Sequence, residues 1–289
     1  MLTALIKTMR PRQWTKNVFV FFAIVFDKQL FNLTAFTHTL AGFALFCLIS
    51  SVVYLINDIA DIEVDRQHPV KRHRPLPSGQ LPIKTAWVAA VLLIVTILPL
   101  SYLLSPGFSA VIISYFLINL AYSKWLKHVP ILDVFIIAAG FMLRVEAGLN
   151  LIIVERFSPW LYVVTTLGSL YLGFGKRRAE LTLLAQGAGT HRKVLEGYSI
   201  PLLDQYITIV SAATILSYSL YTFSAPNLPA NHTMMLTIPF IAYIIFRYLY
   251  LIQMTHNAGA PDEVLLTDRP IQISILLAGL VILVVFYLQ

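Results

Sequence analysis

Residues 37–65 read THTLAGFALFCLISSVVYLINDIADIEVD, and this stretch decides the fold class. Its first part, residues 37–56, is apolar and long enough to cross a bilayer, because a spanning helix needs about 20 residues at about 1.5 Å rise per residue. Its last part, residues 57–65, carries three aspartates and one glutamate. A membrane span that runs directly into an acidic segment indicates an integral membrane protein with a polar site at the end of its helices.

The rest of the chain continues the apolar pattern. It has 289 residues, of which 58% are hydrophobic and 12% charged, whereas a soluble domain carries about 25% charged residues. The alternation of a membrane β-barrel is not seen, and the single Cys47 excludes an intrachain disulfide and a cysteine metal cluster. We therefore expect an all-α, polytopic membrane protein whose nine transmembrane helices cover residues 17–31, 37–57, 84–104, 107–122, 131–153, 158–175, 204–223, 233–254 and 270–288.

The basic residues indicate how the chain is oriented. Lysine and arginine number 21 against 14 acidic residues, which gives a net charge of +7. With a cytoplasmic N-terminus, 17 of these 21 basic residues fall in cytoplasmic segments, as the positive-inside rule requires. The basic excess then needs no nucleic-acid partner. We predict one transmembrane domain, residues 1–289, in the cytoplasmic (inner) membrane, with the long segments 57–84 and 176–203 on the cytoplasmic side.

The acidic segment has the spacing of a metal site. In a continuing helix Asp58, Asp61 and Asp65 lie within an arc of about 60°, and Glu63 points away. Three carboxylates on one face repel one another unless a cation lies between them. Oxygen ligands suit Mg²⁺, which completes its octahedron with water and substrate phosphates. The spacing predicts a Mg²⁺ site, and the alternative is a solvated helix end.

Lys71, Arg72 and Arg74 follow this acidic segment. Arginine makes two-pronged contacts to phosphate, and lysine supplies a point charge. Next to a carboxylate–metal site, these residues predict a clamp for phosphate or diphosphate. Without the aspartates, they would be read as positive-inside anchors.

Two arginines, Arg144 and Arg247, lie within predicted spans. A charge in a span is costly unless it faces a polar cavity or pairs internally, and both readings stay open. We expect Asp133 to orient Lys127 or Arg144.

These motifs resemble a known family. Asn57-Asp58-x-x-Asp61-x-x-x-Asp65, followed by Lys71-Arg72-x-Arg74-Pro75-x-Pro77-Ser78-Gly79, resembles the first signature of the UbiA superfamily of intramembrane prenyltransferases. Tyr122-Ser123-x-x-Leu126-Lys127 resembles a second segment of that family. The resemblance implies nine helices around a central cavity and a metal–diphosphate site at the cytoplasmic face. Segments 57–84 and 176–203 would cap this active site.

One segment departs from the family pattern. Where the family carries a second Asp-x-x-x-Asp motif, residues 173–181 read GFGKRRAEL, so a second all-aspartate metal site is not expected. Together with RPRQWTKN at 10–17 and PDEVLLTDR at 261–269, this segment resembles the decaprenyl-phosphate phosphoribosyltransferase branch.

That branch implies Mg²⁺-dependent transfer of a 5-phosphoribosyl group from 5-phosphoribosyl 1-diphosphate to a polyprenyl phosphate, in the synthesis of cell-wall precursors. A prenyltransferase that joins a polyprenyl diphosphate to an aromatic acceptor, and a lipid or phosphate transporter, stay open as alternatives. The expected catalytic and metal-binding residues are Asp58, Asp61 and Asp65. The expected substrate contacts are Lys16, Asn57, Lys71, Arg72, Arg74, Tyr122, Lys127, Arg144, Lys176, Arg177, Arg178 and Glu180.

Overall fold

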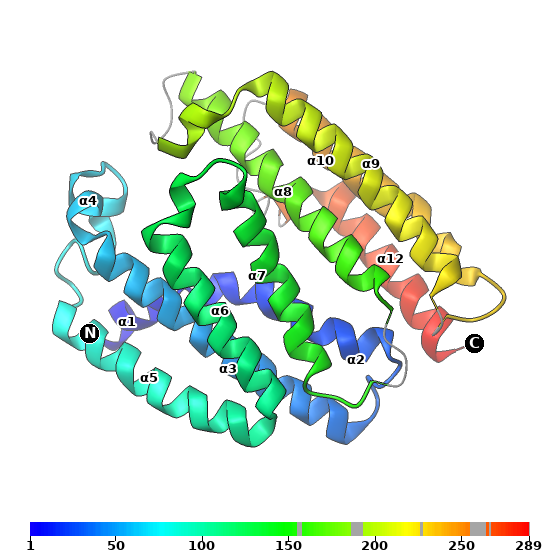
Figure 1. The fold of residues 1–289 in the computed structure, drawn as a ribbon, viewed down its shortest axis with the longest axis horizontal. Helices are drawn as coiled ribbons and strands as arrows, with labels where there is room; N and C mark the ends of the chain where they lie inside the picture. The colour runs from blue at the N-terminus through cyan, green and yellow to red at the C-terminus, as the bar shows by residue number, and fades with distance from the viewer. Residues whose placement is uncertain (155–157, 186–192, 226–227, 255–263, 266, 289) are drawn as a thin grey trace. The chain divides into compact units, whose positions relative to one another are not determined.

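The protein is all-α, as the sequence predicts (Figure 1). The computed structural model describes every residue except 155–157, 186–192, 226–227, 255–263, 266 and 289. Its described residues form helices and connecting turns and contain no strand. They divide into two compact units. Residues 1–25, 29–124 and 143–154 form the first unit, and residues 26–28, 125–142 and 155–289 form the second.

The first unit is built around α3 (Leu33–Ala60). The Asn32 side chain starts this helix by accepting hydrogen bonds from the backbone N–H groups of Thr34 and Ala35. Of the apolar window of α3, 61% is buried, against 17% for α5, so α3 is central and α5 peripheral. The elements of this part of the chain are α1 (Leu2–Met9), the 3-10 helix η1 (Pro11–Phe21), α2 (Phe22–Phe26), α3, α4 (Ile62–Gln67), η2 (Lys71–His73), α5 (Ile83–Leu104) and α6 (Pro106–Lys124).

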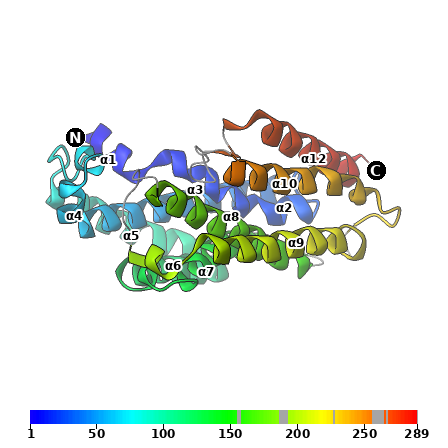
Figure 2. The same ribbon diagram turned by 90° about the horizontal axis from the view of Figure 1, so that it is seen from above.

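The second unit is built around α8, which packs along α9, while α10 packs against α12 (Figure 2). Tyr171 and Phe174 of α8 are buried in its core with Leu203, Ile207 and Tyr248. Helix α7 belongs to both units, because its residues 143–149 are part of the first. The elements are η3 (Leu126–His128), α7 (Leu132–Leu149), α8 (Trp160–Ala185), η4 (Lys193–Gly197), α9 (Ile200–Ser224), η5 (Thr233–Thr237), α10 (Ile238–Met254) and α12 (Arg269–Tyr287).

Six helical stretches of the described chain are long and apolar enough to cross a membrane. They are α3, α5, α6, α9, η5 with α10, and α12. The other three predicted spans differ from this pattern. Residues 17–31 contain the end of η1 and the short α2 instead of one long helix. Helix α7 carries Asp133, Arg144 and Glu146, and α8 includes the charged run 176–180. The protein is thus an integral membrane protein, and nine spans stay a prediction.

A close contact between α7 and η1 gives a first test of the fold. A Cβ atom added to Gly148 would lie 2.1 Å from the carbonyl oxygen of Val20, whereas one added to Gly168 of α8 meets nothing within 4 Å. We expect Gly148→Ala to lower the melting temperature in detergent, because a backbone segment must move. Gly168→Ala should leave it unchanged or raise it, since alanine favours a helix by up to about 1 kcal/mol. Equal stability of the two variants would contradict this packing.

Candidate active site

The end of α3 brings two of the three predicted aspartates together. The helix is interrupted at Asp61, which has φ −95° and ψ 8°, and α4 begins at the next residue. Two backbone hydrogen bonds carry the helical spacing across the interruption. Asp61 N–H donates to Asn57 O at 3.0 Å, and Asp65 N–H donates to Asp61 O at 2.8 Å. Asp58 and Asp65, 4% and 1% exposed, are therefore held one above the other and buried.

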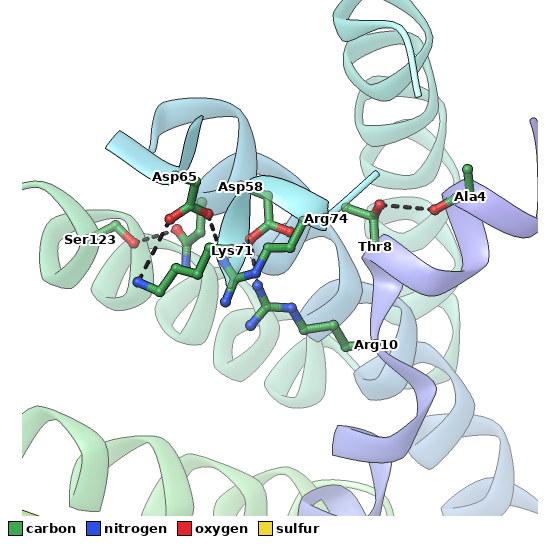
Figure 3. Close-up of polar contacts among 9 residues, drawn as sticks. Ala4, Thr8, Arg10, Asp58, Asp65, Lys71, Arg74 and Ser123 are labelled. Carbon is green, nitrogen blue, oxygen red and sulfur yellow. Dashed lines mark hydrogen bonds and ion pairs between the residues drawn. The ribbon is translucent and has the colours of Figure 1, made fainter. Parts of the chain in front are cut away.

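Three cationic side chains surround these two carboxylates (Figure 3). Arg10 Nη2 lies 2.5 Å from Asp58 Oδ1. Arg74 Nη1 lies 3.4 Å from the same oxygen and 2.7 Å from Asp65 Oδ2, so one guanidinium bridges both aspartates. Lys71 Nζ lies 3.7 Å from Asp65 Oδ1. We call these five residues the Asp58–Asp65 cluster, whose formal charge is one positive.

Arg10 reaches the cluster from an unusual backbone conformation. It follows α1 with φ 54° and ψ 61°, in the left-handed region that costs a non-glycine residue about 1–2 kcal/mol. The preceding turn is closed by a hydrogen bond from Thr8 Oγ1 to Ala4 O at 2.9 Å (Figure 3). The guanidinium also lies 4.9 Å from the centre of the Tyr54 ring. The ion pair with Asp58 and this cation–π contact offset the backbone cost.

Two other predicted site residues, Asn57 and Asp61, lie near the end of α3. Asn57 accepts a hydrogen bond from Ser123 Oγ, which ties the end of α3 to α6. Asp61 is half-buried and its side chain does not cap α4. Across the described part of the chain, no three His, Cys, Asp or Glu side chains gather as a metal-binding group. The geometry therefore brings two carboxylates to one cation, and the role of Asp61 stays a prediction.

Arg144 makes internal contacts within the first unit. Its Nε donates to Asn17 Oδ1 at 2.8 Å and its Nη2 to Tyr115 Oη at 3.1 Å. Its guanidinium carbon lies 5.4 Å from the Phe46 ring centre and 5.0 Å from that of Tyr115. Of the two readings for this arginine, these contacts favour internal stabilisation, since polar acceptors and aromatic faces replace water around the charge.

The basic run on α8 is engaged inside the second unit. Arg177 is 1% exposed, with Nε 2.6 Å from Asp133 Oδ2 and Nη1 2.6 Å from Glu180 Oε2. Asp133 also accepts a hydrogen bond from Tyr198 Oη at 2.7 Å. Burial, and then this hydrogen bond to Asp133, raise the pKa of Tyr198, so its phenol keeps its proton and donates. Asp133 thus binds Arg177 and Tyr198, and the expectation that it orients Lys127 or Arg144 stays a prediction.

Arg178 points to other neighbours, because adjacent helix positions are about 100° apart. Its Nε lies 2.6 Å from Asp204 Oδ1 on α9, and its Nη1 donates to Ile252 O on α10 at 2.7 Å. In the same unit Arg247 Nη2 lies 3.0 Å from Asp268 Oδ2. Arg177 and Arg178, the two arginines of the basic run on α8, are thus both paired with other groups of the protein.

The other predicted substrate contacts are not part of the Asp58–Asp65 cluster, and their roles stay predictions. Arg72 is exposed, and the side chains of the remaining four are partly buried: Lys16, Tyr122, Lys127 and Lys176. In the motif at 261–269, positions 261–263 and 266 lie outside the described residues.

Several residues of these networks are not among the predicted site residues, including Arg10, Ser123, Tyr198 and Asp204. Arg10 and Ser123 lie in sequence motifs that resemble those of the family, so the sequence carries a signal for both. Tyr198 and Asp204 carry no local signal, because only the fold brings them to Asp133 and Arg178.

The chain belongs to the UbiA prenyltransferase family, whose family model matches residues 17–264. Its fold is similar to that of a solved UbiA homologue from Archaeoglobus fulgidus bound to DMAPP and Mg²⁺. The TM-score is 0.72 at 18% identity, and the match covers 99% of each chain.

Curated relatives resemble the chain over nearly its whole length. It is 36% identical to the decaprenyl-phosphate phosphoribosyltransferase of Corynebacterium glutamicum, over 93% of this chain and 82% of that protein. It is 34% identical to the protein of the same name from Mycolicibacterium smegmatis, over 94% of this chain and 89% of that protein.

The buried ion pairs of the second unit predict a large effect on stability. We expect Arg177→Gln to lower the free energy of unfolding by about 3–5 kcal/mol, because it leaves the carboxylate of Asp133 buried without its cation. Equilibrium unfolding in mixed detergent micelles measures this change. Arg66→Gln is the matched control, since Arg66 pairs with Glu63 on the exposed side of α4, and should cost less than about 1 kcal/mol. A loss of similar size in both variants would contradict the assignment.

Proposed function

We propose that this protein transfers a 5-phosphoribosyl group from 5-phosphoribosyl 1-diphosphate to a polyprenyl phosphate. The bond between ribose C1 and the diphosphate breaks, a bond from C1 to an oxygen of the lipid phosphate forms, and diphosphate leaves. The product would serve as a lipid-linked precursor for the cell envelope. The observation that carries the proposal is the similarity to decaprenyl-phosphate phosphoribosyltransferases along more than nine-tenths of the chain.

The Asp58–Asp65 cluster fits a magnesium ion. Carboxylate oxygens of both aspartates lie within 3.4 Å of one nitrogen, Arg74 Nη1, so a single cation can contact both residues. Mg²⁺ is commonly held by one or two carboxylates together with substrate phosphates. Asp58 and Asp65 would hold the ion, with Asp61 as a further proposed ligand. When bound, it supplies positive charge that stabilises the departing diphosphate.

The side chains around the cluster supply binding and orientation. Arg74 and Lys71 lie beside the aspartates and would bind diphosphate oxygens, with Arg72 as a further proposed contact. The acceptor phosphate is already anionic, so the reaction needs no strong general base. Positioning and electrostatic stabilisation would supply most of the rate acceleration. The remaining proposed substrate contacts are Lys16, Asn57, Tyr122, Lys127, Arg144, Lys176, Arg177, Arg178 and Glu180.

The ion pairs of Arg177 and Arg178 limit how these residues can act. Each is already bound to a carboxylate, so a contact to substrate phosphate would use N–H groups that these ion pairs leave over, or would require a pair to open. Lys176, on the same turn of α8, is a further proposed phosphate ligand of the run.

The proposal includes the arrangement in the membrane. The chain would lie in the cytoplasmic membrane as one domain of nine spans around a central cavity. Its N-terminus and the segments 57–84 and 176–203 would lie on the cytoplasmic side, as the distribution of basic residues favours. The lipid tail would stay in the bilayer while its phosphate enters the site.

The product formed by the purified protein tests the reaction. We expect ribose-labelled 5-phosphoribosyl diphosphate, Mg²⁺ and a panel of polyprenyl phosphates to give a lipid-linked ribose phosphate and free diphosphate. A prenylated aromatic from polyprenyl diphosphate and an aromatic acceptor would instead identify a prenyltransferase. Unchanged substrate that crosses a vesicle membrane would identify a transporter. Either of these results, without lipid-linked ribose, would contradict the proposal.

Substitutions of the aspartates test the metal assignment. Asp58→Asn and Asp61→Asn should each lower turnover by about 100-fold or more, because an amide does not replace an ionised ligand at a site that stabilises transition-state charge. Both proteins should remain folded in detergent. Glu63→Gln is the control, since Glu63 is exposed and pairs with Arg66, and should be nearly as active as the wild type. Normal activity with normal Mg²⁺ dependence in both asparagine variants would refute the assignment.

A further inference from the structure

The hydroxyl of Tyr198 joins two segments of the second unit that are far apart in the sequence. Its oxygen accepts a hydrogen bond from the backbone N–H of Ile131 at 2.5 Å and donates one to Asp133 Oδ1 at 2.7 Å. Tyr198 is 7% exposed, and Asp133 is fully buried. A phenol both accepts and donates, so one hydroxyl satisfies both groups. Tyr198 therefore holds the start of α7 at two points.

The segments around this hydroxyl are closely packed. A Cβ atom added to Gly197 would lie 2.3 Å from Pro130 Cγ, so the chain that follows η4 lies directly on the turn before α7. A Cβ atom added to Gly173 of α8 would lie 2.5 Å from Val134 Cγ1. Ile131 has φ 69° between these two contacts, a conformation that its neighbours must stabilise. We call the packing of α8, η4 and the start of α7 the α7 junction.

The first lysine that the α7 junction holds is Lys127. It lies on η3, which ends three residues before Ile131. Val129 N–H donates to Leu126 O at 3.2 Å, and Asp133 N–H donates to Val129 O at 3.0 Å, so hydrogen bonds run from η3 into α7. The hydrogen bond from Ile131 to the tyrosine thus fixes the end of the turn that carries Lys127.

The second lysine is Lys176, which directly precedes Arg177 on α8. Asp133 Oδ2 lies 2.6 Å from Arg177 Nε, and Arg177 Nη1 lies 2.6 Å from Glu180 Oε2. One cation thus faces two carboxylates, so these ion pairs neutralise the arginine and hold this turn of α8 against α7. The hydrogen bond that Asp133 accepts from the tyrosine extends the same constraint to the position of Lys176.

We propose that Tyr198 is a positioning residue whose hydroxyl sets Lys127 and Lys176 in place to bind phosphate monoesters. The inference rests on the proposed function, in which the lipid phosphate and the 5-phosphate of the donor are both phosphate monoesters. A lysine acts as a point charge, so its contribution depends on its distance from the anion. Loss of the hydroxyl leaves the N–H of Ile131 without this acceptor and Asp133 without one donor, and the junction shifts to satisfy them. Tyr198 itself makes no bond to substrate.

Binding measurements on the purified full-length protein test the proposal. Tyr198→Phe keeps the buried ring and removes only the hydroxyl. Calorimetry in detergent gives the affinities for ribose 5-phosphate, for a polyprenyl phosphate and for inorganic diphosphate with Mg²⁺. We expect the variant to bind at least one of the two monoesters about three- to tenfold more weakly, the net effect of one hydrogen bond. Its affinity for diphosphate with Mg²⁺ should stay within about twofold of the wild type, because the aspartates expected to hold that ligand share no partner with Tyr198.

Tyr218→Phe is the matched control. Tyr218 is also 7% exposed and lies in the second unit, and its hydroxyl is 2.6 Å from Thr237 Oγ1. Both variants should have lower melting temperatures than the wild type, because each loses a buried hydrogen bond. Only Tyr198→Phe should lose affinity for a phosphate monoester. A structural role alone would give the two variants the same binding.

A second comparison shows whether Tyr198 acts through the lysines. In a Lys127→Gln, Lys176→Gln background, adding Tyr198→Phe should cause no further loss of affinity, because the groups that it positions are gone. A full further loss in that background would refute the proposal. So would equal losses for all three ligands, no loss for either monoester, or a wild-type protein that binds neither monoester.

The two monoesters identify which phosphate the lysines bind. A loss confined to ribose 5-phosphate assigns them to the donor, and a loss confined to the polyprenyl phosphate assigns them to the acceptor. If the wild-type protein binds these monoesters but forms no lipid-linked ribose phosphate, the proposed reaction is wrong. The binding series then still decides the role of Tyr198.

Discussion

Two aspartates buried at the end of a membrane-spanning helix impose the constraint on which the first unit depends. A buried carboxylate is tolerated only when cations and hydrogen bonds replace the water it has lost. Asp58 and Asp65 receive those cations from two distant parts of the sequence, the residue after α1 and the segment at 71–74. These ion pairs thus hold the N-terminal segment and the loop after α4 at the end of α3.

In the second unit the buried charge at the centre of the network is positive, and carboxylates are its partners. Arg177 is a buried cation on α8, and it is matched by Asp133 from α7 and by Glu180 one turn along its own helix. Tyr198 adds a hydrogen bond to Asp133 and receives one from the backbone N–H of Ile131 at 2.5 Å. Ile131 has φ 69°, a conformation that is costly for a β-branched residue. The network therefore fixes the start of α7 against both α8 and the segment that follows η4.

The sequence predicts some features of this protein and not others, for physical reasons. Apolar length and the three- and four-residue spacing of the aspartates predict helices and a common face, because both are local properties. Asp58 and Asp65 share that face even though the helix is interrupted between them. Charge pairing is not local. The sequence alone gives the same prediction, a phosphate ligand, for Lys176, Arg177 and Arg178. In the structure Arg177 is bound to Asp133 and Arg178 to Asp204, and only the fold brings these partners together.

We propose that the carboxylates of Asp58 and Asp65 hold a metal ion that in turn holds the diphosphate of the donor. Pulsed electron–nuclear double resonance on Mn²⁺-loaded protein tests this claim directly, because ³¹P coupling to the ion requires phosphate oxygens in its coordination sphere. We expect ³¹P coupling in the wild-type protein when 5-phosphoribosyl diphosphate is added, and its loss in a folded Asp58→Asn, Asp65→Asn double variant. Coupling of equal strength in that double variant would show that the metal and the diphosphate are held elsewhere, and would contradict the account.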